Sequence, residues 1–223
     1  MSDEGGLQLL PRGRSAPAPE VVARIHRQRL LRAMGEAVAE KGYVATSIGD
    51  IVGRARVSRS AFYACFADKE ACFLAGYQQE ADRHFGMIAA TMQEGNWWDQ
   101  LPKAIHAYVA ELDAQPAFAR SFLVEILAAG RRALELRDTV YERYASLMAA
   151  WYEAAPRELG LPRLPAEVFR GAVGAINELA VARLEARAAD GALPLETLVR
   201  YCLFSLFGLT EVARESLPPA SGD

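Results

Sequence analysis

The sequence predicts an all-α protein with a small N-terminal domain and a larger C-terminal one. Along most of the chain, apolar residues recur at steps of three and four, the spacing that places side chains on one face of an α-helix. Capping residues, and prolines near helix starts, divide this pattern into segments of helical length. No stretch alternates apolar and polar residues over a useful length, so we expect no β-sheet. The chain has 223 residues, of which 52% are hydrophobic, so it can bury a substantial core.

Residues 1–20 are rich in Gly, Pro, Ser and Ala and are expected to form a flexible arm. The arm carries Arg12 and Arg14, and basic arms of this kind can enter a DNA minor groove. A disordered tail without such a role is the simpler interpretation. A first helix is expected from Val22 to Gly42, because apolar residues form a stripe along it and Gly42 is a suitable C-cap.

Two short helices joined by a tight turn are expected next. Ser47 and Asp50 have the spacing of a capping box, in which both side chains satisfy backbone N–H groups of the first helical turn. A helix is therefore expected from about Ser47 to Arg54. Residues 55–57 break the pattern, and Ser58 is a suitable N-cap for a second helix over residues 59–66.

The second short helix has two different faces. Phe62 and Phe66 lie four residues apart and share an apolar face, whereas Arg59, Ser60 and Tyr63 point outward. A helix of two turns needs support from its neighbours, and a basic, hydroxyl-bearing front is typical of a helix that reads the DNA major groove. An ordinary helical hairpin with a solvated face has the same spacing, so spacing alone leaves both interpretations open.

An ordered set of short motifs covers this region and continues beyond it. The motifs are Gly42-Tyr43, Thr46-Ser47-Ile48, Asp50-Ile51, Val57-Ser58, Phe62-Tyr63, Phe66 and Asp68-Lys69-Glu70. Together they resemble the N-terminal signature of the tetracycline-repressor (TetR) family of transcriptional regulators, over residues 21–75. Arg56 departs from the pattern, because the family usually has Gly there, and a left-handed Arg56 would cost about 1 kcal/mol. Ser60-Ala61 replaces the usual Gly-Thr, so no operator sequence can be transferred from a relative.

The resemblance implies a ligand-responsive regulator of transcription, usually a repressor, that acts as a homodimer on a palindromic operator. It implies a flexible arm at residues 1–20, a DNA-binding domain at 21–67 and a ligand-binding and dimerising domain at 68–217. Four residues match family positions that contact backbone phosphates: Thr46, Ser47, Tyr63 and Lys69. Three residues match family positions that face base edges: Arg59, Ser60 and Ala61. The N-cap residue Ser58 lies beside them and is expected to belong to the same DNA-binding surface. Arg59 could bind guanine O6 and N7 with two hydrogen bonds.

Charge is distributed unevenly along the chain. Residues 1–69 hold 11 Lys or Arg and 7 Asp or Glu, whereas residues 70–223 hold 14 and 21. A basic N-terminal segment on an acidic body concentrates the attraction for phosphate at one end of the molecule. A difference of this size also arises by chance, so it supports DNA binding only weakly.

The C-terminal part is expected to begin with a long helix from Asp68 to about Gln93, roughly 39 Å in length, which would link the two domains. Apolar and aromatic residues recur along it at steps of three and four, and Gly95-Asn96 is expected to end it. Further helices are expected over residues 98–113, 116–129, 131–155, 165–189 and 194–215.

The last two predicted helices are apolar on every side, so each should be buried on every side. One face can meet the chain's own core, and the other is expected to meet a second copy across a two-fold axis. The alternative is that both helices lie centrally in a monomer, but a domain of five or six helices has room for about one fully enclosed helix. The expected dimer interface contains Ala172, Val173, Ile176, Tyr201, Phe204 and Gly208.

Aromatic residues are frequent between residues 85 and 180, and buried Tyr and Trp side chains need polar partners. A cavity lined by such residues would suit an apolar ligand that carries one polar group. For any single residue, a place in the ordinary core is the simpler interpretation. The expected ligand-binding residues are Phe85, Ile88, Met92, His106, Tyr108, Phe122, Tyr144, Trp151 and Asn177.

The sequence contains no phosphate-binding loop, no nucleophile elbow and no cluster with metal-ligand spacing, so we expect no catalytic residues, no metal and no cofactor. The odd number of cysteines, three, is typical of reduced thiols, and no apolar run is long enough to cross a membrane. We therefore expect a cytoplasmic protein that is not an enzyme. A helical enzyme, and a ligand-binding or interaction module without DNA binding, are the alternatives.

Overall fold

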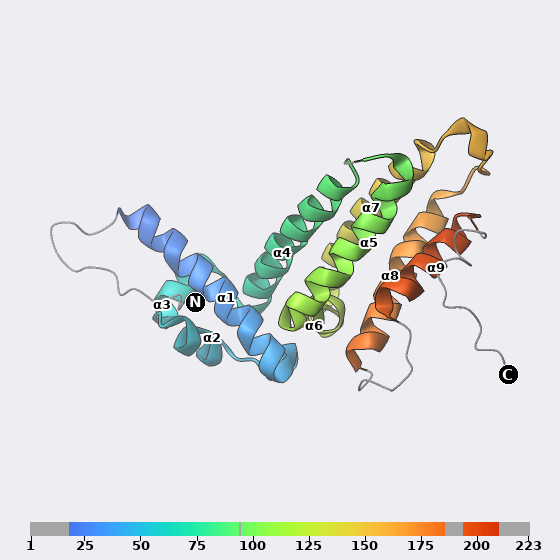
Figure 1. Cartoon of the computed structure of the whole chain (residues 1–223). Helices are drawn as coiled ribbons and strands as arrows, with labels where there is room; N and C mark the ends of the chain where they lie inside the picture. The colour runs from blue at the N-terminus through green and yellow to red at the C-terminus, as the bar shows by residue number, and fades with distance from the viewer. Residues whose placement is uncertain (1–17, 94, 186–193, 210–223) are drawn as a thin grey trace, which may run out of the picture.

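The structure is a computed structural model that describes residues 18–93, 95–185 and 194–209 (Figure 1). Within these residues it contains α-helices and short 3-10 helices and no β-strand, which confirms the predicted all-α class. The elements in chain order are α1 (Pro19–Ala45), α2 (Ile48–Ala55), α3 (Arg59–Cys65), α4 (Lys69–Thr91), α5 (Trp97–Ala114), α6 (Pro116–Leu123), η1 (Glu125–Ala128), α7 (Arg131–Glu153), η2 (Arg157–Leu159), α8 (Ala166–Glu185) and α9 (Leu195–Leu206).

The helices α1, α2 and α3 form the N-terminal unit, because α2 and α3 both pack against α1 and against each other. Its core contains fully buried side chains from all three helices, including Leu30, Met34, Ile51 and Phe62. The helix α1 is assigned to Ala45, three residues beyond the predicted end at Gly42, but the regular helix is interrupted at Gly42 as predicted. The φ of Gly42, 80°, is outside the helical range.

The caps predicted for the two short helices are confirmed. The Ser47 hydroxyl accepts a hydrogen bond from the backbone N–H of Asp50, and the Asp50 carboxylate accepts one from the N–H of Ser47. At the start of α3, the Ser58 hydroxyl accepts from the N–H of Ala61. Arg56 ends α2 in the left-handed conformation, with φ 53° and ψ 47°, as expected at this turn. The turn geometry is therefore kept although the residue is not Gly.

The helix α4 connects the N-terminal unit to the rest of the protein, since it packs against α1 and also against α5 and α7 (Figure 1). The Asp68 carboxylate caps its first turn by accepting from the N–H of Ala71, as predicted. The helix has 23 residues and is therefore about 35 Å long. One continuous element thus reaches from the short helices to the far end of the C-terminal domain.

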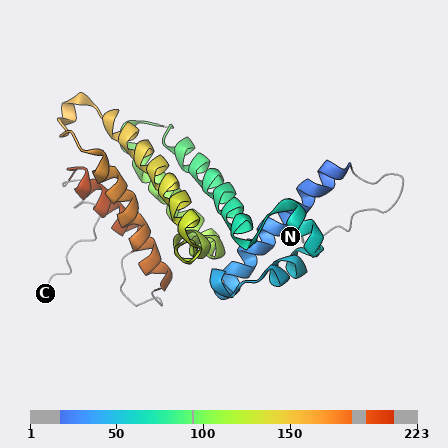
Figure 2. The same ribbon diagram turned by 180° about the vertical axis from the view of Figure 1, so that it is seen from behind.

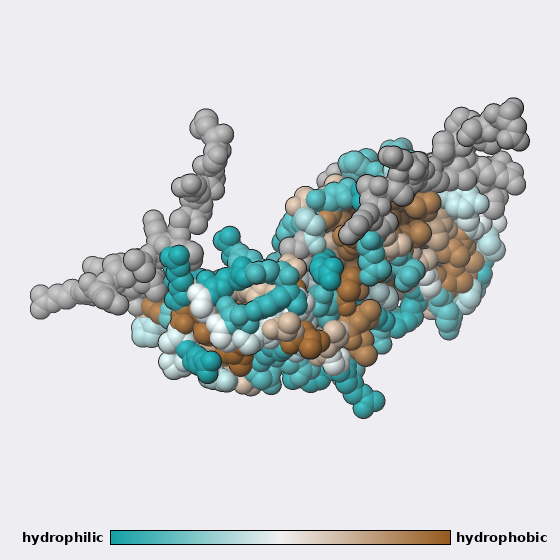
Figure 3. All heavy atoms as spheres, turned by 90° about the horizontal axis from the view of Figure 1, so that it is seen from below, coloured by the Kyte–Doolittle hydropathy of each residue, from teal (hydrophilic) through white to brown (hydrophobic). Residues whose placement is uncertain are grey.

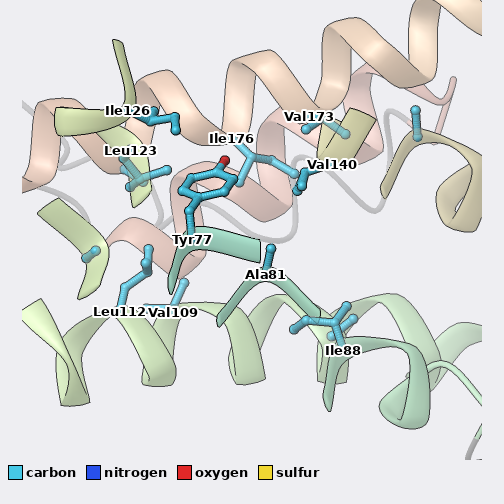
Figure 4. Packing of buried hydrophobic residues seen from close by; sticks show 14 of the residues in the cluster. Tyr77, Ala81, Ile88, Val109, Leu112, Leu123, Ile126, Val140, Val173 and Ile176 are labelled. Atoms are coloured by element: carbon cyan, nitrogen blue, oxygen red, sulfur yellow. The ribbon is translucent and has the colours of Figure 1, made fainter. Parts of the chain in front are cut away.

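The C-terminal domain is a bundle in which α7 packs on α8, α8 on α9, and α5 on both α4 and α9. Figure 2 shows α7 and α8 side by side. In the core, the Tyr77 ring of α4 lies between Leu123 and Ile126 on one side and Ile176 on the other (Figure 4). The chain thus buries one continuous cluster of apolar side chains that runs from the short helices to α9.

Two predicted helices are shorter than expected. The segment 116–129 divides into α6 and η1, because Val124 leaves regular helical geometry with φ −109°. The last helix ends at Leu206, where Phe207 and the left-handed Gly208, with φ 76°, terminate it. The expected continuations to residues 189 and 215, and the arm with Arg12 and Arg14, lie outside the described residues. The 3-10 helix η2 was not predicted.

Candidate functional site

The outer face of α3 is formed by the three side chains that the sequence placed there. Arg59, Ser60 and Tyr63 are exposed, and Tyr63 has 57% of its surface accessible. Phe62 on the opposite face is fully buried, and its ring centroid lies 5.9 Å from that of Phe66. The helix therefore presents a polar, cationic front on an apolar base.

Arg27 of α1 supports α3 from behind. Its Nη1 donates a hydrogen bond of 3.5 Å to the carbonyl oxygen of Cys65, the last residue of α3. Its guanidinium also lies 4.6 Å from the centroid of the Phe66 ring. Cationic groups at a helix C-terminus are favourable because they meet the unpaired carbonyl groups there. Arg27 thus fixes the far end of α3, a role that the sequence pattern did not reveal.

The hydroxyl groups at the start of α3 form a local network. The oxygen atoms of Ser58 and Ser60 lie 2.8 Å apart, and Ser58 also accepts from the backbone N–H of Ala61 at 3.1 Å. Ala61 is half-buried, whereas Ser58 and Ser60 are exposed. The Ser60-Ala61 pair therefore combines one outward hydroxyl with a small, half-buried side chain.

Two of the residues predicted to contact phosphates have supporting positions in this structure. Thr46 is only 2% exposed, and its hydroxyl donates to the carbonyl oxygen of Gly42 at 2.8 Å. Lys69 Nζ donates to the carbonyl oxygens of Tyr43 and Thr46, both at 2.9 Å, and lies 4.2 Å from the Tyr43 ring centroid. Burial lowers the pKa of Lys69. The expectation of a direct phosphate contact by Thr46 is corrected by its burial, and that of Lys69 stays a prediction.

The segment 42–46 is also held from the C-terminal domain. Glu125 of η1 accepts a hydrogen bond of 2.7 Å from the backbone N–H of Tyr43, and this carboxylate is buried. Arg120 Nε lies 3.3 Å from the other oxygen of the same carboxylate. A Cβ atom at Gly42 would lie 3.2 Å from Glu125 Oε2, so the glycine leaves room for this contact. Sequence reasoning missed Glu125, although the break at Gly42 leaves an amide that needs an acceptor.

The second candidate site is a cavity of about 60 Å³ between α4, α5, α7, α8 and α9. A cavity of this volume can hold a few water molecules or a small ligand group. Its walls are mostly aliphatic and aromatic, and include flexible methionine side chains from α4 and α7. The lining residues are His84, Ile88, Met92, Leu101, Ala104, Ile105, Tyr108, Val140, Tyr141, Tyr144, Leu147, Met148, Val173, Ile176, Asn177, Val199 and Leu203.

Four of the polar residues that line the cavity form two hydrogen-bonded pairs. His84 Nδ1 lies 2.6 Å from the hydroxyl oxygen of Tyr144, and the hydroxyl of Tyr108 donates to Asn177 Oδ1 at 3.2 Å. His84 is 1% exposed, and burial lowers its pKa from 6.5 to about 4. Burial raises the pKa of the Tyr108 and Tyr144 hydroxyls. At neutral pH these four side chains therefore carry no charge.

The structure brings five of the nine predicted ligand-binding residues to this cavity: Ile88, Met92, Tyr108, Tyr144 and Asn177. Of the other four, Phe85, His106 and Trp151 do not line the cavity, and the prediction for Phe122 is not tested. Phe85 lies outside it, with its ring against Tyr144 and the guanidinium of Arg143. The His106 side chain is 72% exposed and pairs with Glu196 at 3.1 Å. The side chain of Phe122 lies outside the described part of the structure.

Trp151 is also not a cavity residue, because it forms a structural pair with Trp97. The two indole rings stack at 4.4 Å, and each ring N–H donates to the backbone carbonyl of the other residue, at 2.8 and 3.2 Å. This reciprocal contact joins the start of α5 to the end of α7. The count of aromatic residues indicated a cavity, but it could not separate lining residues from such a contact.

The predicted dimer residues require the largest correction. Ala172, Val173, Ile176 and Phe204 are buried within the single chain, and Val173 and Ile176 line the cavity. Of the predicted set, only Tyr201, which is 40% exposed, and Gly208 lie on the outside. Figure 3 shows apolar surface on the part of the molecule formed by α8 and α9. The exposed apolar residues there include Leu206, so four of the six predicted interface residues face the chain's own core, and the dimer itself stays a prediction.

The remaining sequence expectations concern absences. Among the described residues, no group of His, Cys, Asp and Glu side chains has the arrangement needed to hold a metal ion. No helix within the same part of the chain combines the length and the apolar character that a membrane span requires.

Residues 30–75 match the sequence profile described as bacterial regulatory proteins, tetR family. No curated protein sequence matches the chain. Similar solved structures include the fatty acid degradation regulator FadR from Bacillus halodurans, with 19% identity and a TM-score of 0.68, over 81% of this chain and 97% of that one. FadR from Bacillus subtilis, solved in complex with stearoyl-CoA, has 16% identity and the same TM-score and coverage. A transcriptional regulator from Pseudomonas aeruginosa PAO1 has 18% identity and a TM-score of 0.67, over 90% and 96% of the two chains.

A helix-turn-helix unit joined by one long helix to a helical bundle is the architecture that this chain shares with the solved regulators. The resemblance to the TetR family is confirmed. Residues 30–75 match the family's N-terminal domain, and the described chain has the fold of the solved regulators.

Proposed function

We propose that this protein is a transcriptional repressor that binds a palindromic operator as a homodimer and is released by a small, largely apolar effector. The observation that carries the proposal is the outer face of α3, where Arg59, Ser60 and Tyr63 are exposed above a fully buried Phe62. A helix presented in this way fits the major groove, whose width admits one α-helix. The left-handed Arg56 supports the same proposal, because it keeps the turn intact.

The side chains on this surface would contact different parts of the DNA. Arg59 would bind base edges, and Ser47 and Tyr63 would contact phosphates together with Lys69. Ser58, Ser60 and the half-buried Ala61 would lie at the start of the helix, nearest to the bases. Arg27 and Glu125 would act indirectly, by holding the end of α3 and the segment before α2.

A homodimer would form through the outer faces of α8 and α9. Tyr201 and Leu206 are exposed there, and Leu198 and Cys202 are half-buried within one chain. A two-fold axis through such a surface makes it pack on itself, and two copies of α3 would then be about 34 Å apart, one turn of DNA. A symmetric dimer of this kind requires a palindromic operator.

The cavity is the proposed effector site. Its walls are apolar with a few polar groups, the composition typical of small-molecule sites. The Bacillus subtilis neighbour is solved with stearoyl-CoA, so an acyl chain is one candidate class of effector. At about 60 Å³ the cavity must widen to admit a long chain, and Met92 and Met148 are the flexible side chains best suited to move.

Two contacts would couple the cavity to DNA. The helix α4 provides His84, Ile88 and its C-cap residue Met92 to the cavity, and it also packs against α1. Glu125 of η1 holds the backbone of Tyr43, four residues before the cap of α2. A ligand that widens the cavity would shift both elements and therefore the spacing of the two α3 helices. By thermodynamic reciprocity, operator DNA would weaken ligand binding by the same factor.

The first experiment selects binding sequences from random DNA with the purified protein. We expect enrichment of a two-fold symmetric sequence with half-sites one helical turn apart. Enrichment of no sequence would contradict DNA recognition, and enrichment of a single half-site would contradict the dimer.

The second experiment fills the cavity without a ligand by the substitution Met92→Trp. This change is far from α3, and we expect it to alter affinity for the selected operator, measured by fluorescence anisotropy. Ala110→Trp is the control, because residue 110 is exposed on α5. Equal operator affinity for wild type and a folded Met92→Trp protein would contradict the coupling.

A further inference from the structure

The described residues that line the cavity are uncharged, and this restricts the chemistry of the effector more than the apolar character of the walls does. The described residues that line it include no Lys, Arg, Asp or Glu. The charged groups that act on His84 are Glu111 and Arg83, which form an ion pair with each other. The guanidinium of Arg137 lies 4.8 Å from the ring centroid of the lining residue Tyr141, but Arg137 is not itself a lining residue. A charged group of a ligand would therefore lose its hydration without meeting an opposite charge.

The titratable side chains inside the cavity do not supply a charge either. His84 keeps a neutral ring at neutral pH because burial lowers its pKa to about 4. The tyrosines that face it are neutral as well, since burial raises the pKa of Tyr108 and Tyr144. Burying an ion without a partner costs several kcal/mol, whereas a neutral polar group needs only a hydrogen bond.

The two hydrogen-bonded pairs can supply that bond. Tyr108 and Asn177 join α5 to α8, and His84 and Tyr144 join α4 to α7, so polar atoms from four helices border the same cavity. A hydroxyl can both donate and accept, an amide offers both functions, and a neutral imidazole has one donor and one acceptor nitrogen. An uncharged hydroxyl or carbonyl group of a ligand can therefore form a hydrogen bond with one member of either pair in place of that member's present partner.

We propose that the effector enters this cavity with an uncharged polar end, such as a hydroxyl, ester or other neutral carbonyl group, and that free carboxylates and amines are rejected. This inference rests on the proposed function, because it assigns the chemical class of the ligand at the same site. It goes further in naming what the polar end must be.

Four probes with the same eight-carbon chain test it: 1-octanol, methyl octanoate, octanoate and octylammonium. Binding to the full-length protein at pH 7.5 is measured by calorimetry and by the NMR shifts of the Met92 and Met148 methyl groups, which locate the ligand in the cavity. We expect the two neutral probes to bind at least about 100-fold more tightly than either ion. If octanoate or octylammonium binds as tightly as 1-octanol and causes the same methyl shifts, the proposal is wrong.

A matched pair of variants tests the polar partners. Asn177→Leu should weaken the binding of 1-octanol by about 2-fold to 10-fold, which is the effect of losing one neutral hydrogen bond. Ile176→Leu alters the neighbouring lining residue without removing a polar group and should change the affinity by less. Equal effects of the two substitutions would contradict the role of Asn177.

Met92→Lys places a cation in the cavity wall and should reverse the preference, so that octanoate binds more tightly than 1-octanol. An unchanged preference in a folded Met92→Lys protein would overturn the electrostatic argument. If none of the four probes binds the wild-type protein, the assignment of the cavity as the effector site is wrong together with this inference, whereas DNA binding by the dimer is tested separately by the operator selection. Binding of octanoate alone would leave the effector site standing and overturn only the inference of an uncharged ligand.

Discussion

The outer face of α3 and the cavity are built in opposite ways. On α3 the polar side chains are exposed, and Arg59 gives the face a positive charge. In the cavity the polar side chains are buried in hydrogen-bonded pairs, and the lining residues are neutral at physiological pH. The first surface suits a hydrated polyanion whose binding weakens with salt, and the second suits an uncharged apolar molecule. The two sites therefore respond to different chemical changes in their surroundings.

The same comparison extends to how each site is supported. The outer face of α3 consists of exposed side chains, and the helix is supported from behind by its buried Phe62 and by the hydrogen bond from Arg27 to the carbonyl of Cys65. The cavity is enclosed by side chains from five helices. A substitution on α3 should therefore change recognition with little loss of stability, whereas a substitution in the cavity wall should change stability first. The predictions below test this difference, from the largest expected effect to the smallest.

The largest effect is expected for Val173→Asp, which places a carboxylate in the buried cavity wall. Val173 is enclosed within one chain, so an unpaired charge there should lower the free energy of unfolding by about 3–5 kcal/mol, measured by urea denaturation. Leu206→Asp is the control, because Leu206 is exposed on the outer face of α9. It should leave the fold intact and convert the proposed dimer to monomer. A stable Val173→Asp monomer would restore the original assignment of this face to the dimer.

The next effect concerns pH and the buried imidazole of His84. Its pKa is lowered from 6.5 to about 4, so below pH 6.5 the unfolded chain binds a proton that the folded chain does not. The stabilising contribution is fully present above pH 6.5 and is lost as the pH falls toward 4, by about 3 kcal/mol in total. Measuring the free energy of unfolding of the wild type and of His84→Gln at pH 7.5 and 4.5 isolates the contribution of His84. The variant should lose less stability between these pH values, and an equal loss would contradict the buried neutral histidine.

On α3 the expected effect is on recognition. Arg59→Ala should weaken binding to the selected operator by about 1–3 kcal/mol and should affect scrambled DNA much less, because a bidentate contact to guanine is lost. Tyr63→Phe is the comparison, since loss of a phosphate contact should weaken all sequences alike. Anisotropy titrations with both DNAs, at one salt concentration, separate the two outcomes. Equal losses on both DNAs for Arg59→Ala would contradict its base-reading role.

The sequence predicted the N-terminal unit more accurately than the C-terminal domain, and the reason is physical. Caps such as Ser47 with Asp50, and Ser58, are local interactions between residues three apart, so the sequence order contains them. The choice between the two faces of α8, and between those of α9, depends on which helices lie next to them. Val173 and Leu206 are equally apolar, and only the fold decides that the first is buried and the second exposed.

The contacts that join the two domains could not be predicted for the same reason. Glu125 lies 82 positions from Tyr43, and no local pattern relates a carboxylate in η1 to an amide after Gly42. Trp151 shows the reverse case, in which a residue type typical of ligand sites is used for packing. Its indole N–H is satisfied by the carbonyl of Trp97 rather than by a ligand. Composition thus indicated that buried polar groups need partners, but the fold determines which partners they have.

The smallest effect is expected at the turn between α2 and α3. Arg56 has φ 53°, a conformation that costs a residue with a Cβ atom about 1 kcal/mol relative to Gly. Arg56→Gly should therefore raise the melting temperature by about 2–4 °C for a chain of this size, measured by calorimetry. Arg56→Ala keeps the Cβ atom and should give no such increase, which separates backbone strain from any effect of the lost charge. Because the turn already has the required geometry, operator affinity should change little in Arg56→Gly. An equal rise in melting temperature for both variants would show that the guanidinium, and not the left-handed backbone, is the unfavourable feature.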